Sequence, residues 1–91
     1  MELSLDLGDC MSLKEKRSVI RPIIERLRRM GVSCAEVADQ DLWNRARIGV
    51  AFVSGSSGIV EDELRACVEV CLDLCPGPVE VVSEDRIHPP K

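Results

Sequence analysis

The spacing of apolar residues changes between alternation and helical spacing along this chain, and the order of these changes constrains the fold more than any other feature. In MELSLDLG, residues 1–8, every second side chain is apolar, which is typical of a strand with one buried face. Residues 12–30 follow the helical period. The remaining expected elements are strands at 32–38, 47–54 and 79–87, with a second helix opened by SGSSG (54–58) and ended by PGP (76–78).

This strand–helix–strand–strand–helix–strand order predicts an α+β protein of the ferredoxin-like βαββαβ type. In that fold a four-stranded antiparallel sheet carries two helices on one face. A length of 91 residues suffices for one core. We therefore expect a single domain of residues 1–91, with βαβ halves at 1–38 and 47–87, a hairpin loop at 39–46 and a tail at 88–91.

The first helix carries clear end signals. Ser12 with Glu15 three residues later forms a capping-box pattern, and Gly31 supplies a residue suited to the left-handed conformation that ends many helices. Pro22 lies inside the helical pattern, where it lacks an N–H and clashes with the preceding turn. A kink there, or a shorter helix, is therefore expected.

The second helix places Glu61, Asp62 and Glu63 in its expected first turn, where the helix dipole favours acids. Farther along, three cysteines recur every four residues and share one helical sector with apolar side chains. They are predicted to be small core residues rather than metal ligands, because paired Cys-x-x-Cys spacings are absent. The three are Cys67, Cys71 and Cys75.

Basic residues concentrate on the first helix although the formal net charge of the chain is −4. Wound at about 100° per residue, Lys14, Arg17, Arg21 and Arg28 fall within a sector of roughly 60°. This stripe is either a phosphate-binding face or an ordinary solvated surface, and Glu25 beside it offsets part of its charge.

The uncovered sheet face is a poor surface for stacking nucleobases. The first strand would present Glu2, Ser4 and Asp6 there, and Phe52 shares the phase of the core residues. Nucleic-acid contacts should therefore use the basic helix or the hairpin, whose Arg45 and Arg47 complete the candidate set.

The stretch DQDLWNR, residues 39–45, holds the single tryptophan. If the third strand starts early, Trp43, Arg45 and Arg47 point one way while Leu42 and the core residues point the other. Trp43 then either folds over the sheet edge with its indole N–H on a neighbouring aspartate, or forms an interaction site, with Gln40 as a second candidate. The interaction site would serve a protein partner or a homodimer.

Catalytic chemistry has little support. The single histidine, His88, lies in the proline-rich tail, and SGSSG lacks the lysine and spacing of a phosphate-binding P-loop. We expect no catalytic residue, no metal, no cofactor and no small-molecule substrate. The apolar runs are too short for a membrane span, and the acidic start does not resemble a secretion signal, so a cytoplasmic location is expected.

The motifs SLKEKR (residues 12–17), AEV (35–37), QDLW (40–43) and GVA (49–51) together resemble the bacterial YlxP-like proteins, domain of unknown function 503. The resemblance implies a small ferredoxin-like domain without an established enzyme activity. The genes of that family tend to lie near genes for translation and ribosome maturation. We therefore expect a noncatalytic, ribosome-associated or RNA-binding protein.

Overall fold

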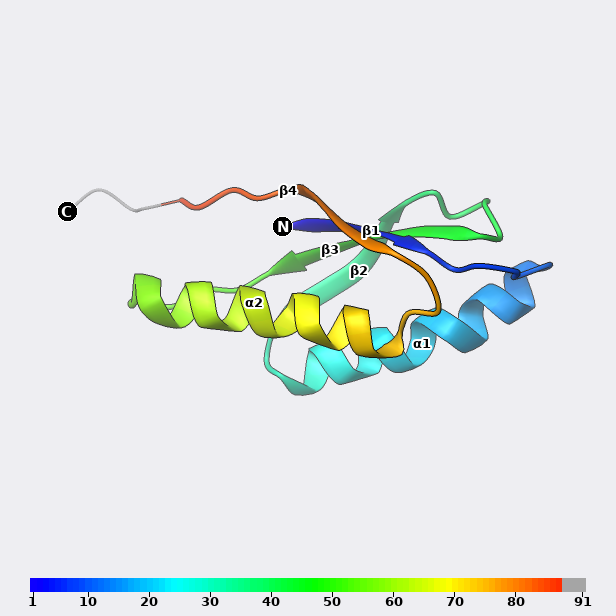
Figure 1. Ribbon diagram of the computed structural model, residues 1–91. Coiled ribbons are helices and arrows are strands. Elements are labelled where there is room, and N and C mark those ends of the chain that lie inside the picture. The colour runs from blue at the N-terminus through cyan, green and yellow to red at the C-terminus, as the bar shows by residue number, and fades with distance from the viewer. Residues whose placement is uncertain (88–91) are drawn as a thin grey trace.

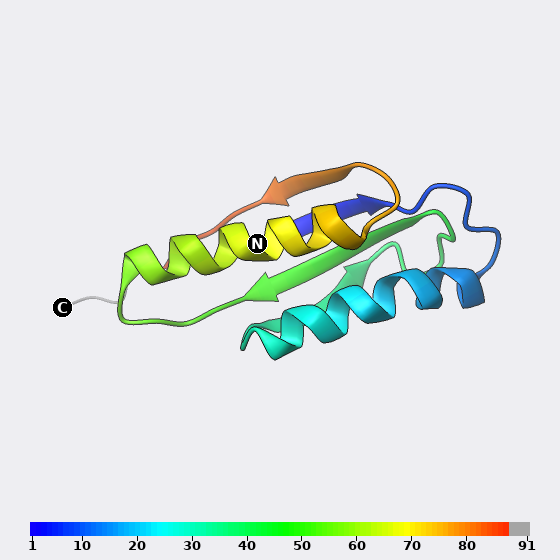
Figure 2. The same ribbon diagram turned by 60° about the horizontal axis from the view of Figure 1, so that its bottom comes forward.

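The computed structural model describes residues 1–87 and forms the predicted ferredoxin-like fold (Figures 1 and 2). The four strands make one antiparallel sheet in the order β2-β3-β1-β4. Both helices cover the same face, with α1 against β2 and α2 against β4. The elements are β1 (Glu2–Asp6), α1 (Leu13–Arg29), β2 (Ser33–Ala38), β3 (Arg45–Ala51), α2 (Ser57–Leu74) and β4 (Val79–Ser83). The predicted tail with His88 lies outside the described residues.

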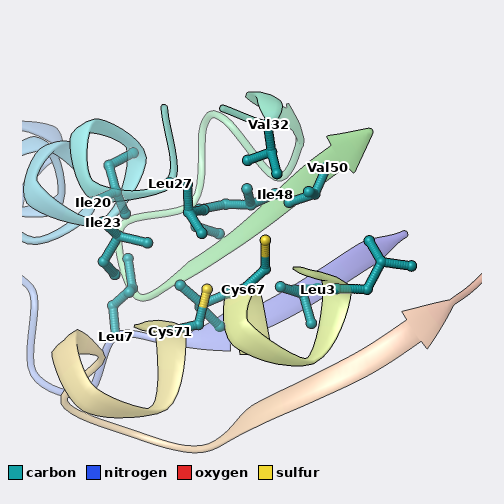
Figure 3. Close-up of a cluster of buried hydrophobic side chains, with 13 residues drawn as sticks. Leu3, Leu7, Ile20, Ile23, Leu27, Val32, Ile48, Val50, Cys67 and Cys71 are labelled. Atoms are coloured by element: carbon teal, nitrogen blue, oxygen red, sulfur yellow. The ribbon is translucent and has the colours of Figure 1, made fainter. Parts of the chain in front are cut away.

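The core lies between the sheet and the two helices (Figure 3). Alternation in β1 sends Leu3 and Leu5 inward, and both are fully buried. The sulfur atoms of Cys67 and Cys71 project from α2 into this cluster, as the helical spacing predicted. Burial raises the pKa of the Cys67 thiol to about 11 and that of Cys71 to about 12, so both stay protonated and unreactive at neutral pH.

Capping fixes the ends of α1. The Ser12 hydroxyl accepts a hydrogen bond from the Glu15 amide at 3.1 Å, while the Glu15 carboxylate accepts from the Met11 amide at 2.7 Å. Gly31 follows the helix with φ +88°, as expected. Pro22 does not shorten the helix, which continues to Arg29, because Pro22 and Ser18 are exposed and water can reach the carbonyl that loses its partner.

Four predicted boundaries are wrong, and cross-strand pairing explains the three in the sheet. β3 starts at Arg45 because that residue pairs with Asp6, and it ends at Ala51, the last residue opposite β2. β4 ends at Ser83, which pairs with the first residue of β1. The helix α2 begins at Ser57 with Ser56 as its N-cap, which leaves the acids at 61–63 beyond the first turn. No helix within residues 1–87 has the length and apolar character to cross a bilayer.

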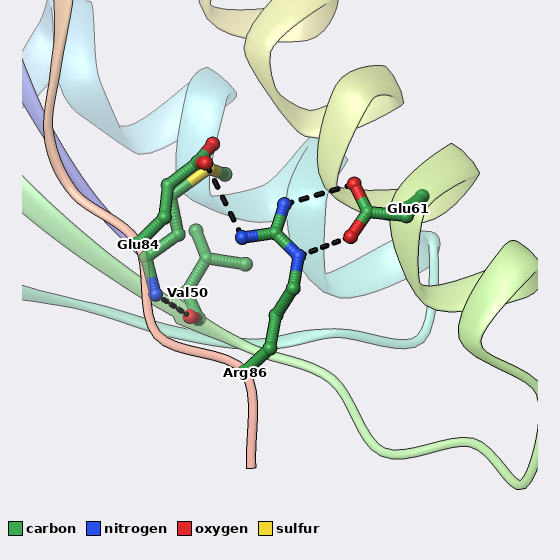
Figure 4. A network of polar contacts seen from close by, with 5 residues as sticks. Val50, Glu61, Glu84 and Arg86 are labelled. Carbon is green, nitrogen blue, oxygen red and sulfur yellow. Dashed lines mark hydrogen bonds and ion pairs between the residues drawn. The ribbon is translucent and has the colours of Figure 1, made fainter. Parts of the chain in front are cut away.

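The segment after β4 is tied to α2 by a surface ion-pair network (Figure 4). The Arg86 guanidinium donates to both carboxylate oxygens of Glu61, with Nη2 2.8 Å from Oε2, and reaches Glu84 at 3.3 Å. The hydrogen bond from Arg86 lowers the pKa of Glu61 and raises that of Arg86. Because these groups are solvent-exposed, the network aligns this segment with α2 but adds little stability.

Candidate nucleic-acid interface

The four predicted basic residues of α1 are all exposed on the outer face of the helix. Two shallow depressions, of about 290 and 390 Å³, run along this face and share the side chains of Arg17, Arg21 and Glu25. Arg28 lines the first depression and Lys14 the second. The structure therefore gathers Lys14, Arg17, Arg21 and Arg28 into one continuous surface, which we name the α1 basic face.

The helical layer is divided by charge. The helix α1 has seven basic and two acidic residues, a net of +5, whereas α2 has one basic and five acidic residues, a net of −4. The two helices lie side by side over the sheet (Figure 2). A polyanion can therefore approach this layer favourably only over α1.

Arg45 and Arg47 lie elsewhere, on the sheet face that the helices leave open. Along β3 the two arginines alternate with the buried residues Ala46 and Ile48, so both arginines lie on the opposite side of the sheet from α1. Arg47 is 3.9 Å from the carboxylate of Glu2. The six predicted basic residues thus occupy two separate faces, and the open face also carries carboxylates.

The β2–β3 hairpin exposes its large apolar side chains. Trp43 is 51% exposed and lies outside the core, and Leu42 is 46% exposed instead of pointing inward, because β3 begins only at Arg45. Met11, from the loop between β1 and α1, is 69% exposed. Both loops lie at the same end of the molecule (Figures 1 and 2) and enclose a depression of about 390 Å³ that Trp43 lines.

The feature that sequence reasoning missed is a buried ion pair beneath the hairpin. Lys16 is 2% exposed, and its ammonium nitrogen lies 2.7 Å from Oε2 of Glu36, which projects from β2 toward the helices. Within residues 1–87 that oxygen accepts no hydrogen bond, so the contact is an ion pair alone. The same nitrogen donates to the backbone carbonyls of Asp39 at 2.6 Å and Gln40 at 3.5 Å.

Backbone hydrogen bonds complete the anchoring of this hairpin. Asp39 adopts φ +60°, and its carbonyl also accepts from the Leu42 amide at 3.0 Å. The Asn44 carbonyl accepts from the Leu7 amide at 2.8 Å. The side chain of Gln40, a predicted interaction residue, donates to the Glu36 carbonyl at 3.1 Å and thus braces the loop. The Trp43 side chain is therefore presented by a fixed loop.

Residues 1–87 contain no assembled site for metal binding or thiol chemistry. No cluster of three or more potential metal ligands occurs in this part of the chain. The half-buried Cys75 thiol donates to the Asp6 carbonyl, and burial raises its pKa. The features that could bind a partner are the α1 basic face and the Trp43 hairpin.

Comparisons with known proteins point to one family. The family model described as "Protein of unknown function (DUF503)" matches residues 1–86. The chain is also similar to the "Uncharacterized protein YlxP" of Bacillus subtilis (strain 168), with 43% identity over 58 residues. That match covers 63% of this chain and 63% of the Bacillus protein, so it spans less than two thirds of either.

Proposed function

We propose an RNA-binding, ribosome-associated role for this chain, which belongs to the DUF503 family of proteins of unknown function. The observation that carries the proposal is the α1 basic face, where four exposed cationic side chains line two adjoining depressions on one helix. Such a face suits the regularly spaced phosphates of structured RNA.

The proposed mechanism is noncatalytic binding of RNA through its phosphates. Arg17 and Arg21 lie at the centre of the face, where each planar guanidinium can donate two hydrogen bonds to one phosphate. Lys14 and Arg28 extend the contact along the helix. Glu25 lies among these residues and opposes phosphate, so the face should bind RNA with moderate affinity.

Replacing Arg17 and Arg21 together with alanine is expected to weaken binding to bacterial ribosomes and to structured RNA. With about 0.7–0.9 counterions released per phosphate, four contacts predict a slope of roughly −3 for log affinity against log salt, and the double variant should lose about half of it. Fluorescence anisotropy with a labelled RNA hairpin at several salt concentrations measures the slope.

The matched control is Arg26→Ala/Arg29→Ala. It removes the same charge from two exposed residues of the same helix that lie outside the α1 basic face. Equal losses in the two double variants would show a diffuse charge effect and contradict the proposed face. Failure of the unmodified protein to co-sediment with ribosomes, together with no salt-dependent RNA affinity, would reject the function altogether.

A second candidate function is a protein contact or homodimer at the Trp43 hairpin. It is favoured by the exposure of three large apolar side chains, Met11, Leu42 and Trp43, at one end of the molecule. Tryptophan is enriched at the energetic centres of protein interfaces. A chain that stays monomeric at high concentration and recovers no partner protein would contradict this candidate.

A further inference from the structure

The depression beside Trp43 combines an aromatic side chain with carboxylates from two loops. One side is formed by Asp9 and Met11, between β1 and α1, and the other by Asp41, Trp43 and Asn44 of the hairpin. Its volume of about 390 Å³ can hold one or two side chains of a partner. We infer that this depression binds an arginine side chain of a basic partner protein, an inference that rests on the hairpin being a protein contact.

Charge complementarity selects the occupant. Within residues 1–87 neither Asp9 nor Asp41 takes part in an ion pair, so the depression carries two uncompensated negative charges. A phosphate or an acidic segment would be repelled there. A cation is attracted by both carboxylates and by the face of the indole ring, which is the strongest cation–π partner among the aromatic side chains.

Arginine fits this combination better than lysine. Its guanidinium is planar, so it can stack on Trp43 while its edge donates two parallel hydrogen bonds to Asp41. The ammonium of lysine is more strongly hydrated and cannot stack or donate bidentately in this way. An apolar side chain could cover Met11 and Trp43, but it would leave the carboxylates desolvated without a partner.

The hairpin is organised before any partner arrives. Lys16 holds the carbonyls of Asp39 and Gln40 from below, and the bond between Leu7 and Asn44 fixes the other side. Binding therefore requires little further ordering of this loop, and a preorganised site loses less free energy to ordering. The two loops that line the depression lie at the opposite end of the molecule from the N-terminal end of α2 (Figure 2), so the acids at 61–63 give a distant acidic control.

The fluorescence of Trp43 tests the inference directly, because the chain contains one tryptophan. A blocked Gly-Arg-Gly-Arg-Gly peptide should change the emission saturably, and its lysine counterpart should bind at least about fivefold more weakly. Asp41→Asn should weaken arginine-peptide binding about tenfold, whereas Asp62→Asn on α2 should leave it unchanged. Trp43→Phe, followed by calorimetry, should retain most of the affinity and Trp43→Ala should lose it.

Equal binding of the two peptides, or full binding by Asp41→Asn, would overturn the inference. A short oligouridylate that competes with the peptide in Arg17→Ala/Arg21→Ala would also overturn it, because the depression would then accept nucleotides. Sedimentation of the free chain separates failure of this inference from failure of the hairpin contact. Self-association that Trp43→Ala abolishes, without arginine binding, would reject the arginine site and leave a hairpin interface between copies standing.

Discussion

Replacing Lys16 with alanine is expected to lower the free energy of unfolding by about 3–5 kcal/mol, which for a chain of this length is a large share of the total. The variant leaves the Glu36 carboxylate, which is 18% exposed, without its cation, and it removes the donor that holds the Asp39 and Gln40 carbonyls. Urea unfolding followed by circular dichroism measures the change.

Two further variants test whether the lost stability of Lys16→Ala comes from the buried ion pair. Lys14→Ala removes the same charge from an exposed position on the same helix, and it should alter stability by less than about 0.5 kcal/mol. Lys16→Met/Glu36→Leu replaces both partners by apolar groups of similar size, and it should recover much of the stability that Lys16→Ala loses. A loss in Lys16→Ala no larger than that in Lys14→Ala would contradict the buried pair.

Gly77→Ala is expected to destabilise the fold by about 1–3 kcal/mol through a steric conflict with the backbone. A methyl group at this position would lie 2.5 Å from the Asp6 carbonyl oxygen, which also accepts a hydrogen bond from the Cys75 thiol. The strand β4 is docked at this place by a hydrogen bond from the Asp6 amide to the Pro78 carbonyl at 2.9 Å. Relief of the conflict therefore requires β4 and β1 to separate.

Gly55→Ala is the matched control for Gly77→Ala, because nothing lies within 4 Å of the added methyl group there. Its effect on the free energy of unfolding should be near zero or slightly favourable. Thermal and urea unfolding of both variants give the comparison. A Gly77→Ala protein as stable as Gly55→Ala would contradict the prediction. It would show that the backbone at Asp6 can shift at little cost and that close packing of Gly77 against it is unimportant.

The fold could be predicted because its information is local. Alternation set the buried face of β1, and Ser12 and Gly31 marked the ends of α1. Strand boundaries were less accurate, since the extent of β3 depends on which residues of β1 and β2 lie opposite it. Pairing of that kind connects distant parts of the chain and leaves no mark in the residues at the strand ends.

The candidate site was predicted in part. The exposure of the α1 stripe followed from helical spacing, but the depression at Trp43 joins two loops about 30 residues apart, and the sequence does not show that they meet. The sequence did contain a signal for the burial of Lys16, because this residue shares the helical phase of Ile20, Ile23 and Leu27, all of which are buried. Its charge suggested a surface position, and the long side chain reaches the hairpin only because β2 passes beside α1.

The opposite charges of the two helices also bear on the proposed RNA-binding role. A chain with net charge −4 is repelled as a whole by a polyanion, yet the separation of charge between α1 and α2 gives the helical layer a dipole. Under the proposed RNA-binding role, the field of the RNA would exert a torque on this dipole that turns α1 forward before contact, so the number of unproductive collisions would fall. At physiological ionic strength the field extends only about 8 Å, hence added salt should slow association more than it speeds release.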